Sequence, residues 1–207
     1  MKVLFLGHAD SPLIAYLSSV GEEVVTTDEK ITPALVKKQR PDFIVSYRYR
    51  HILRPDVLNT LSGRIINLHT SYLPYNRGAE PHFWCLVEGT PCGVTIHDID
   101  AGIDTGDIIT QRRIEALPDD TLKTFYDRLH VGLQALFREH WKDIKNGAVP
   151  RRKQDTEGTY HAMKDIEQFS FLLDEGGAKG ATSVKTLQEY HKQHAGQTPQ
   201  SEWLLDT

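Results

Sequence analysis

Two polar residues interrupt an apolar run in the stretch Ile65-Ile66-Asn67-Leu68-His69. In a β-strand, residues i and i+2 point to the same face, so Asn67 and His69 would lie side by side, about 6 to 7 Å apart. An amide and an imidazole can donate hydrogen bonds to a developing negative charge, and an imidazole can also transfer a proton. The pair predicts a reaction centre. The alternative, two strand-end residues satisfied by loop backbone, stays open.

A second polar cluster is rich in acids and reads His97-Asp98-Ile99-Asp100-Ala101-Gly102-Ile103-Asp104-Thr105-Gly106-Asp107. Its spacing does not match that of a calcium-binding EF-hand loop, so we expect no metal here. One Asp of this cluster is expected to point at the imidazole of His69, where it would raise the pKa of that imidazole and fix its tautomer. A turn built from Asp and Gly would explain the same composition without a function.

The first part of the chain alternates between predicted strands and predicted helices. Strands are expected at residues 3–6, 23–27, 43–46 and 65–69, and helices at 11–20, 33–40 and 55–61. This order predicts an α/β fold with a Rossmann-like, open, mainly parallel sheet and helices on both faces. Such sheets bind ligands at the carboxyl ends of their strands, which is where Asn67 and His69 are expected.

The pattern changes after residue 92. Two strand-like runs, 93–99 and 107–114, are joined by seven residues, which are too few for a crossover helix. They are therefore expected to pair in an antiparallel manner and extend the sheet. Apolar residues at helical spacing then predict a long core-packing helix from Thr121 to Ile144, capped by 119–121 and stopped by 146–150.

The remainder of the chain has weaker signals. Apolar residues between 160 and 172 predict a short helix or a small subdomain, and 176–180 and 191–202 look flexible. We therefore predict a catalytic domain over 1–150 and a short, partly flexible C-terminal segment or appendage over 151–207.

Composition limits the kind of partner. The net charge of −4 provides no strong positive field for a long nucleic acid, and no run is apolar enough to span a membrane. The N-terminal run is too short for a signal peptide, so we expect a cytoplasmic protein. Cys85 and Cys92 match neither a redox pair nor a zinc spacing, and are predicted to be buried, inert thiols.

One further segment lies between the two polar clusters, around Tyr75, Arg77 and Gly78. A glycine beside an arginine, ahead of a helix that begins with proline, predicts a tight loop where backbone approaches a ligand. Nearby aromatic residues, such as Phe83 and Trp84, could cover a sugar or a base, although core packing is their more common fate.

Taken together, "NLHTSYLPYNRGAEPHFW" and "GVTIHDIDAGIDTGDII" closely resemble the motifs of the 10-formyltetrahydrofolate-dependent formyltransferases, over roughly residues 1 to 150. The resemblance implies a catalytic trio of Asn67, His69 and Asp104. It also implies that the pterin of the folate co-substrate contacts two loops. The residues concerned are Tyr49, Arg50, His51, Ile52 and Leu53 in the first loop and Ala101, Gly102 and Ile103 in the second.

Within that family, the sequence looks most like the branch that formylates nucleotide-linked amino sugars, such as a dTDP-4-amino-4,6-dideoxyhexose. Residues 7–12 contain one glycine and a proline, in place of the phosphate loop of glycinamide ribonucleotide formyltransferases. The methionyl-tRNA branch adds a further domain and basic surface. On this interpretation Tyr75, Arg77 and Gly78 contact the amino-sugar substrate.

Other functions stay open: a glycinamide ribonucleotide formyltransferase, a formate-releasing hydrolase, or a folate- or nucleotide-binding protein without turnover. The expected partners are small molecules, namely the folate and the nucleotide-activated sugar, with no nucleic acid, membrane or metal. A homodimer is possible.

Overall fold

The computed structural model describes residues 1–61 and 63–194. This part of the chain forms two compact units, each drawn from several segments. The first unit comprises Met1–His69, Thr95–Gln111 and Leu133–Gln154; the second comprises Thr70–Val94, Arg112–Gly132 and the chain from Asp155 on. The functional division at residue 150 stays a prediction, and residues 151–154 pack with the first unit.

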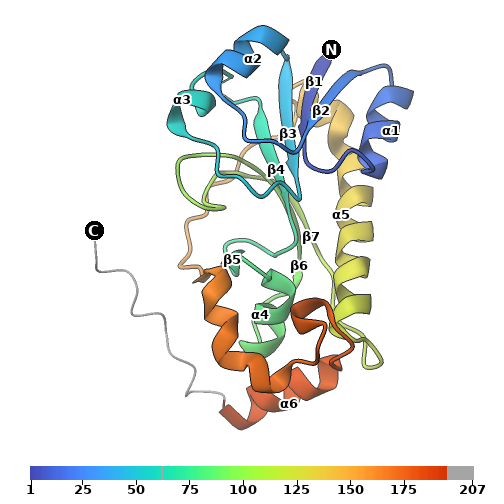
Figure 1. Ribbon diagram of the computed structural model, residues 1–207, viewed down its shortest axis with the longest axis vertical. Coiled ribbons are helices and arrows are strands. Elements are labelled where there is room, and N and C mark those ends of the chain that lie inside the picture. Colours follow the sequence, from blue (N-terminus) through green and yellow to red (C-terminus); the bar gives the residue numbers. More distant parts are fainter. Residues whose placement is uncertain (62, 195–207) are drawn as a thin grey trace. The chain divides into compact units, whose positions relative to one another are not determined.

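A six-stranded sheet with the order β2-β1-β3-β4-β6-β7 forms the framework (Figure 1). Its strands are β1 (Lys2–Leu6), β2 (Glu23–Thr27), β3 (Phe43–Tyr47), β4 (Ile65–His69), β6 (Gly93–Asp98) and β7 (Ile108–Arg113). The first four are parallel, and β6 runs antiparallel to β4. The backbone N–H of Asp98 donates to the carbonyl of Asp107 (2.9 Å), which places β7 beside β6. The predicted fold, with its antiparallel extension, is confirmed.

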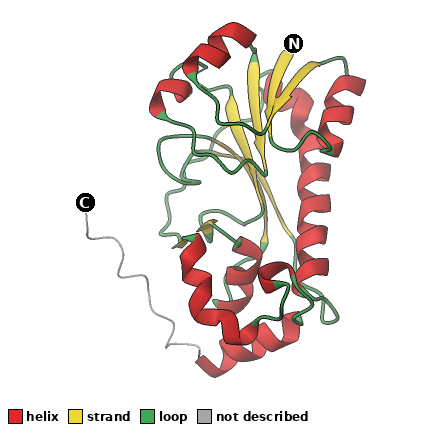
Figure 2. Cartoon of the chain, viewed as in Figure 1, coloured by secondary structure: helices red, strands yellow, loops and turns green. Residues whose placement is uncertain are grey.

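Helices cover both faces of the sheet, as Figures 1 and 2 show. They are α1 (Pro12–Ser19), α2 (Pro33–Gln39), α3 (Pro55–Leu58) and the C-terminal half of α5 (Leu122–Lys145). Neighbouring residues on a strand point to opposite faces. Accordingly, Ile44 packs with Val36 of α2 and Val57 of α3, whereas Phe43 makes an edge contact with Trp141 of α5, with ring centroids 5.2 Å apart.

The long helix α5 begins and ends at the predicted signals. The N–H of Thr124 donates to the hydroxyl of Thr121 (3.2 Å), and the N–H of Thr121 donates to the hydroxyl of Thr124 (2.9 Å). This reciprocal arrangement satisfies two backbone donors at the helix start. At the other end Gly147 has φ +68°, and its N–H donates to the carbonyl of Ile144 (3.0 Å).

The second unit contains a two-stranded parallel sheet and several helices. These are β5 (Arg77–Gly78) paired with β8 (Tyr160–His161), α4 (Pro81–Val87), 3-10 helices at Met163–Leu172 and Gly177–Lys179, and α6 (Val184–His194). Phe83 and Trp84 are buried and contact Phe169, with ring centroids 5.6 and 5.3 Å away. The expectation that these two aromatic residues pack in a core is confirmed.

Two predictions for the C-terminal segment need correction. Residues 191–194 were expected to be flexible, but they form the last turn of α6, and 177–179 form a helical turn. Ser183 precedes α6, and its hydroxyl accepts from the N–H of Thr186 (3.1 Å); the helix buries Val184 and Leu187. This cap and the i, i+3 spacing of Val184 and Leu187 are sequence features that predict a helix here. The rest of the predicted flexible stretch, 195–202, lies outside the described residues.

The prediction that the two cysteines are free thiols is wrong. Cys85 and Cys92 form a disulfide with their Cα atoms 5.5 Å apart. Cys85 lies in α4, and the chain reverses after that helix through Gly89, which has φ +67°, so that Cys92 returns to the same place. Disulfides are rare in reducing compartments, so the expected cytoplasmic location stays a prediction. Within the described ranges, no helix combines the length and apolar character needed to cross a membrane.

Candidate active site

Asn67 and His69 lie at the carboxyl end of β4, an interior strand of the sheet. Antiparallel pairing with β6 sets Asn67 directly opposite His97 and His69 opposite Thr95. The side chains of directly opposed residues are close neighbours on one face of a sheet. The strand register therefore brings a second imidazole, from β6, to the predicted pair.

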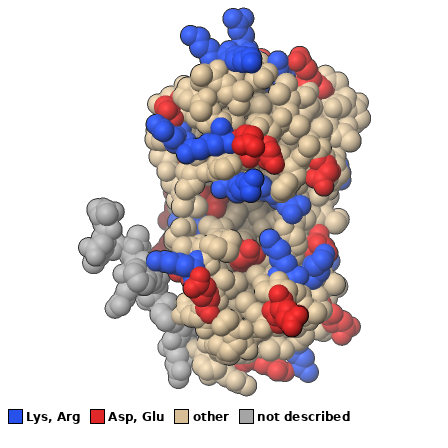
Figure 3. Space-filling view, viewed as in Figure 1, with Lys and Arg blue, Asp and Glu red and all other residues tan. Residues whose placement is uncertain are grey.

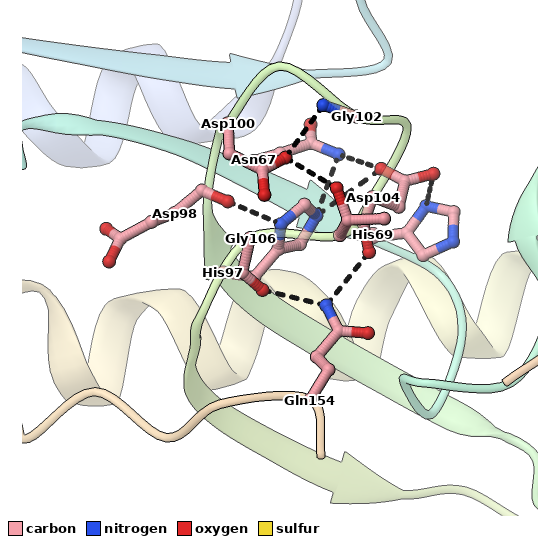
Figure 4. A network of polar contacts seen from close by, with 10 residues as sticks. Asn67, His69, His97, Asp98, Asp100, Gly102, Asp104, Gly106 and Gln154 are labelled. Atoms are coloured by element: carbon pink, nitrogen blue, oxygen red, sulfur yellow. Dashed lines mark hydrogen bonds and ion pairs between the residues drawn. The ribbon is translucent and has the colours of Figure 1, made fainter. Parts of the chain in front are cut away.

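Asp104 is the acid that meets both predicted residues. Its Oδ1 accepts a hydrogen bond from the Asn67 amide nitrogen (3.2 Å), and its Oδ2 lies 3.6 Å from Nδ1 of His69. The side chains of His69 and Asp104 are only 9% and 13% exposed, so water screens this pair weakly. Figure 4 shows the carboxylate between the amide and the imidazole, one oxygen toward each.

His97 is a site residue that the sequence analysis did not assign. Its Nδ1 lies 2.8 Å from the carbonyl oxygen of Asp98, and a carbonyl only accepts, so Nδ1 carries the proton. With the proton on Nδ1 of a neutral ring, Nε2 can accept from the Asn67 amide nitrogen (3.3 Å), and it also lies 3.4 Å from Oδ1 of Asp104. Both N–H bonds of the Asn67 amide thus have partners, His97 and Asp104. The register of β4 against β6 was the missing information.

The segment 98–107, which we call the acid loop, closes through its own polar groups. Asp100 Oδ1 accepts from the N–H of Gly102 (3.1 Å) and from the hydroxyl of Thr105 (2.6 Å). A Cβ on Gly106 would lie 1.8 Å from the carbonyl oxygen of Asp98, so the loop requires a residue without a side chain there. The two interpretations of this Asp- and Gly-rich segment are therefore compatible: Asp100 builds the turn, and Asp104 faces the amide and the imidazole.

Residues 151–154 contact the acid loop from outside the recognised motifs. The Arg151 guanidinium donates to both carboxylate oxygens of Asp98, at 3.0 and 3.4 Å. Burial raises the pKa of Asp98 above its usual range, and the hydrogen bonds and charge of Arg151 act in the opposite direction. Gln154 donates to two carbonyl oxygens of the loop (Figure 4). Nothing in the local pattern around Gln154 marked it as a site residue.

Some of the residues predicted to contact the pterin are buried or bonded within the protein, and others are exposed. The Tyr49 hydroxyl donates to the carbonyl of Glu29 (2.7 Å) and accepts from the N–H of Ile31 (3.0 Å), so its side chain anchors a neighbouring loop. Leu53 is buried in the core. By contrast, Ile52 is 69% exposed and Ile103 is 40% exposed, one on each predicted loop.

A pocket of ≈ 260 Å³ lies beside the acid loop, on the side of α3. Three parts of the chain line it: α3 with residues that follow this helix, Ile65 of β4, and the start of the acid loop. The lining residues are Pro55, Leu58, Asn59, Leu61, Gly63, Ile65, Asp98, Ile99, Asp100 and Ala101. Ala101 belongs to the predicted pterin contacts, and all eight of these contacts, including Arg50, His51 and Gly102, stay predictions.

The residues predicted to contact the sugar lie in the second unit. Arg77 and Gly78 form β5, where the N–H of Arg77 donates to the carbonyl of Thr159 (2.9 Å). Gly78 has φ +89°, and a Cβ there would lie 2.3 Å from the carbonyl oxygen of His161. The glycine is thus required by the approach of β8, a part of the same chain, rather than by a ligand. Contacts of Tyr75, Arg77 and Gly78 with a substrate stay predictions.

Within residues 1–61 and 63–194, no group of three or more His, Cys, Asp or Glu side chains is arranged to hold a metal ion. The fold and the site together place a carboxylate, an imidazole and an amide in contact at the carboxyl edge of the sheet, where open α/β sheets bind their ligands. The profile of the Formyl transferase family matches residues 14–139, more than half of the sequence. The chain belongs to the formyl transferase family.

Solved structures of similar proteins include sugar N-formyltransferases. The formyltransferase PseJ from Anoxybacillus kamchatkensis, solved with UDP-4,6-dideoxy-4-formamido-L-AltNAc and tetrahydrofolate, is 40% identical with a TM-score of 0.86. That match covers 92% of this chain and all of PseJ. A likely sugar N-formyltransferase from Mycobacterium tuberculosis is 26% identical over 81% of this chain and 76% of its own, with a TM-score of 0.69.

Characterised relatives belong to two branches of the family. The methionyl-tRNA formyltransferase of Geobacter metallireducens is 36% identical over 62% of this chain and 42% of its own length. The dTDP-4-amino-4,6-dideoxyglucose formyltransferase of Mycobacterium bovis is 33% identical over 69% of this chain and 60% of its own length. The chain thus spans less than two thirds of either relative.

Proposed function

We propose that this protein transfers a formyl group from 10-formyltetrahydrofolate to the primary amine of a nucleotide-linked amino sugar. The observation that carries the proposal is the contact of one carboxylate, Asp104, with both Asn67 and His69 in a chain of the formyl transferase family. These three residues are the proposed catalytic trio.

The proposed chemistry uses each group for a different task. Attack of an amine on the formyl carbon places negative charge on the formyl oxygen, and a protonated His69 can donate to that oxygen. Asp104 lies beside Nδ1 of the His69 ring, where its negative charge stabilises the imidazolium. The same carboxylate can accept the proton that the amine loses, directly or through a water molecule. When the intermediate collapses, the bond between the formyl carbon and N10 of the folate breaks, and this proton can pass to N10, so that tetrahydrofolate leaves.

The Asn67 amide requires a rearrangement to join this step. Both of its N–H bonds are directed to protein acceptors, Asp104 Oδ1 at 3.2 Å and His97 Nε2 at 3.3 Å. Donation to a substrate oxygen must therefore replace one of these two partners.

The pocket beside the acid loop supports a folate site. Apolar side chains from α3 and β4 line it together with polar groups, among them Asn59, Asp98 and Asp100. Sites for small heterocyclic ligands combine apolar walls with polar groups that fix the orientation of the ligand. A pterin bound here would contact residues 98–101, the start of the loop that carries Asp104.

Narrowing this pocket is expected to weaken folate binding selectively. Asn59 is an exposed residue of the lining, so Asn59→Trp should fill space with little effect on the core. We expect KM for 10-formyltetrahydrofolate to rise about tenfold or more, since a lost subsite removes over 1.4 kcal/mol of binding. Steady-state kinetics measure this, with Lys37→Trp on the exposed side of α2 as the control. Equal KM values for the two variants would exclude the pocket as the folate site.

The choice of acceptor is supported by the relatives and by the loop after β1. PseJ was solved with a UDP-linked formamido sugar, and the Mycobacterium bovis relative is named for a dTDP-linked amino sugar. The loop between β1 and α1 closes on itself: the N–H of Ser11 donates to the carbonyl of His8 (3.1 Å), and the Ser11 hydroxyl accepts from Leu13 (3.4 Å). A phosphate of glycinamide ribonucleotide would compete with these contacts.

A tRNA acceptor is a weaker candidate. The methionyl-tRNA formyltransferase matches 62% of this chain, whereas PseJ matches 92% of it. Lys and Arg side chains are interspersed with Asp and Glu on the face that Figure 3 shows. The absence of nucleic-acid and membrane partners, and the homodimer, stay predictions.

The decisive assay presents 10-formyltetrahydrofolate and a panel of amines to the purified protein. The panel contains dTDP-, GDP- and UDP-linked amino sugars, glycinamide ribonucleotide and charged initiator tRNA. We expect turnover with at least one nucleotide-linked amino sugar and far slower turnover with the other two acceptors. Turnover with glycinamide ribonucleotide alone would overturn the proposed acceptor. Tight folate binding without turnover of any amine would favour a binding protein, and release of formate alone a hydrolase.

A further inference from the structure

We propose that Gln154 is a positioning residue for the reaction: it holds the acid loop from outside and thereby sets the direction in which the Asp104 carboxylate points. The inference rests on the proposed function, because it assigns a catalytic purpose to the orientation of Asp104. Gln154 itself touches backbone atoms of the acid loop, and it acts on the reaction through them.

The backbone of Asp104 needs an external support. Asp104 has φ +54°, a left-handed conformation that costs an L-residue roughly 1 kcal/mol and that Asp tolerates better than most residues. The Cβ direction follows from the backbone angles, so this conformation is what turns the carboxylate toward Asn67 and His69. An alternative conformation of the peptide at Asp104 would move both carboxylate contacts together.

Gln154 supplies that support with one amide group. Its Nε2 donates to the carbonyl oxygen of Asp104 (2.9 Å) and to the carbonyl oxygen of Gly106 (2.7 Å). The two acceptors lie on either side of Thr105, so both N–H bonds of the amide act on the last turn of the acid loop, as Figure 4 shows. Two hydrogen bonds from one planar group restrict the orientation of the peptide planes that follow Asp104 and Gly106.

The position of Gln154 is fixed by the residues before it. Arg152 and Ile108 form an antiparallel bridge, with N–H to carbonyl distances of 2.8 and 2.9 Å. Arg151 pairs with Asp98 at the other end of the acid loop, at 3.0 Å. The segment 151–154 is therefore held against both ends of the acid loop before the Gln154 side chain adds its contacts. A register set by backbone pairing gives the amide a defined place from which to act.

The chemical type of this side chain suits the task. An amide donates to carbonyl oxygens without carrying charge. An Arg or Lys at the same place would bring a positive charge close to the Asp104 carboxylate and would compete with His69 for it. Gln154 thus restrains the loop while leaving the negative charge of Asp104 available for the imidazole.

The principal test compares Gln154→Met, which keeps the length of the side chain and removes both donors, with Gln168→Met. Gln168 is an exposed residue whose amide also donates to a backbone carbonyl, that of Asp165 (2.9 Å), outside the site. For Gln154→Met we expect kcat to fall about 10- to 100-fold, since small displacements of a catalytic group have effects of this size. The apparent pKa values of the kcat profile should shift, while KM and Tm stay close to those of the control.

A combined variant tests whether the effect passes through Asp104. In an Asp104→Asn background, Gln154→Met should lower kcat by less than about twofold, because residues that act as a unit are not additive. An unchanged kcat and pH profile in folded Gln154→Met, or full additivity with Asp104→Asn, would overturn the inference. If Gln154→Met does not fold, Gln154→Glu replaces it. The Glu carboxylate places an oxygen, which cannot donate, against the two carbonyl oxygens, and kcat should fall by the same factor. Failure of both to fold would make Gln154 a folding determinant and would also overturn the inference.

Amide hydrogen exchange separates this inference from the proposed function. If no amine is turned over by the wild-type protein, the proposed function fails. The positioning role is then decided by exchange in the peptide that contains residues 98–107. Faster exchange of this peptide in Gln154→Met than in Gln168→Met would show that Gln154 restrains the loop, and equal exchange in the two variants would contradict the positioning role.

Discussion

Replacing Asp104 with Asn is expected to lower kcat by about two to four orders of magnitude, the usual effect of removing an acid–base group. Asn tolerates the left-handed conformation that Asp104 adopts at φ +54°, so the acid loop should keep its shape. The substitution removes the negative charge next to Nδ1 of His69, and with it the stabilisation of the imidazolium. Rapid-mixing or steady-state kinetics with the best amine of the panel measure the loss.

The acid loop offers a matched control for this experiment. Asp107 carries a charge in the same loop but pairs with Lys153 (3.1 Å), whose side chain is 74% exposed. Because exposed pairs contribute little, Asp107→Asn should change kcat by less than about threefold. If Asp104→Asn kept full activity while Asp100→Asn or Asp107→Asn lost it, the assignment of the catalytic acid within the loop would be wrong.

Substitution of His69 should lower kcat as substitution of Asp104 does, and the effects of the two substitutions should not be additive. His69→Gln is expected to lower kcat about as far as Asp104→Asn does. The double variant should lose little more than the Asp104→Asn variant, since the carboxylate holds the imidazolium and accepts the amine proton in the same step. Independent, multiplicative losses would show that the two residues act in separate steps.

Replacing Glu22 with Gln is expected to lower the free energy of unfolding by roughly 3 kcal/mol, the lower end of the range for breaking a buried ion pair. The Glu22 side chain is 1% exposed and interacts with Lys145, with the indole nitrogen of Trp141 (3.2 Å) and with the N-terminal amine (2.9 Å). It joins the end of α5 to the start of β2. The amide of Gln keeps the shape but leaves the ammonium of Lys145 without its counter-charge.

The contribution of Glu22 should depend on pH in a defined direction. Burial raises the pKa of Glu22, but hydrogen bonds from Lys145, the N-terminal amine and Trp141 outweigh it, so the pKa in the folded protein lies below the ordinary 4.5. A carboxyl with a lowered pKa stabilises the fold fully above its unfolded pKa, and this stabilisation is lost as the pH falls through the folded value. The difference between wild type and Glu22→Gln should therefore be largest at pH 7 and should shrink below about pH 4.5.

Urea unfolding at pH 7 and at pH 3.5 measures both parts of this prediction. Glu23→Gln is the control, because Glu23 is the next residue and pairs with Lys2 at 3.2 Å but is 69% exposed. It should change stability by less than about 1 kcal/mol at either pH. A loss in Glu22→Gln that is equal at both pH values would mean that packing, rather than the ion pairs, accounts for it.

Features that depend on residues close together in the sequence could be predicted from the sequence. The strand at 65–69 and the shared face of Asn67 and His69 follow from the two-residue period of a β-strand, which is a local property. The cap of the long helix at Thr121 and its stop at Gly147 are local as well. These features were predicted at the positions where the structure has them.

Features that depend on chain reversal or on distant partners were missed. The disulfide between Cys85 and Cys92 requires the turn at Gly89, and neither its spacing nor the composition marks it. His97 reaches Asn67 because β6 runs antiparallel to β4 in one particular register, and a shift of one residue would turn His97 to the other face.

By itself, the sequence determined the class of fold, the strand that carries the amide and the imidazole, and, through its motifs, the family. Only the tertiary structure decided how the acid loop is built: Asp100 closes its turn, and Gln154, fifty positions beyond Asp104, donates to two of its carbonyl groups. The physical reason is that side-chain periodicity specifies which way a residue points along its own strand or helix, whereas a loop takes its conformation from the groups that close over it.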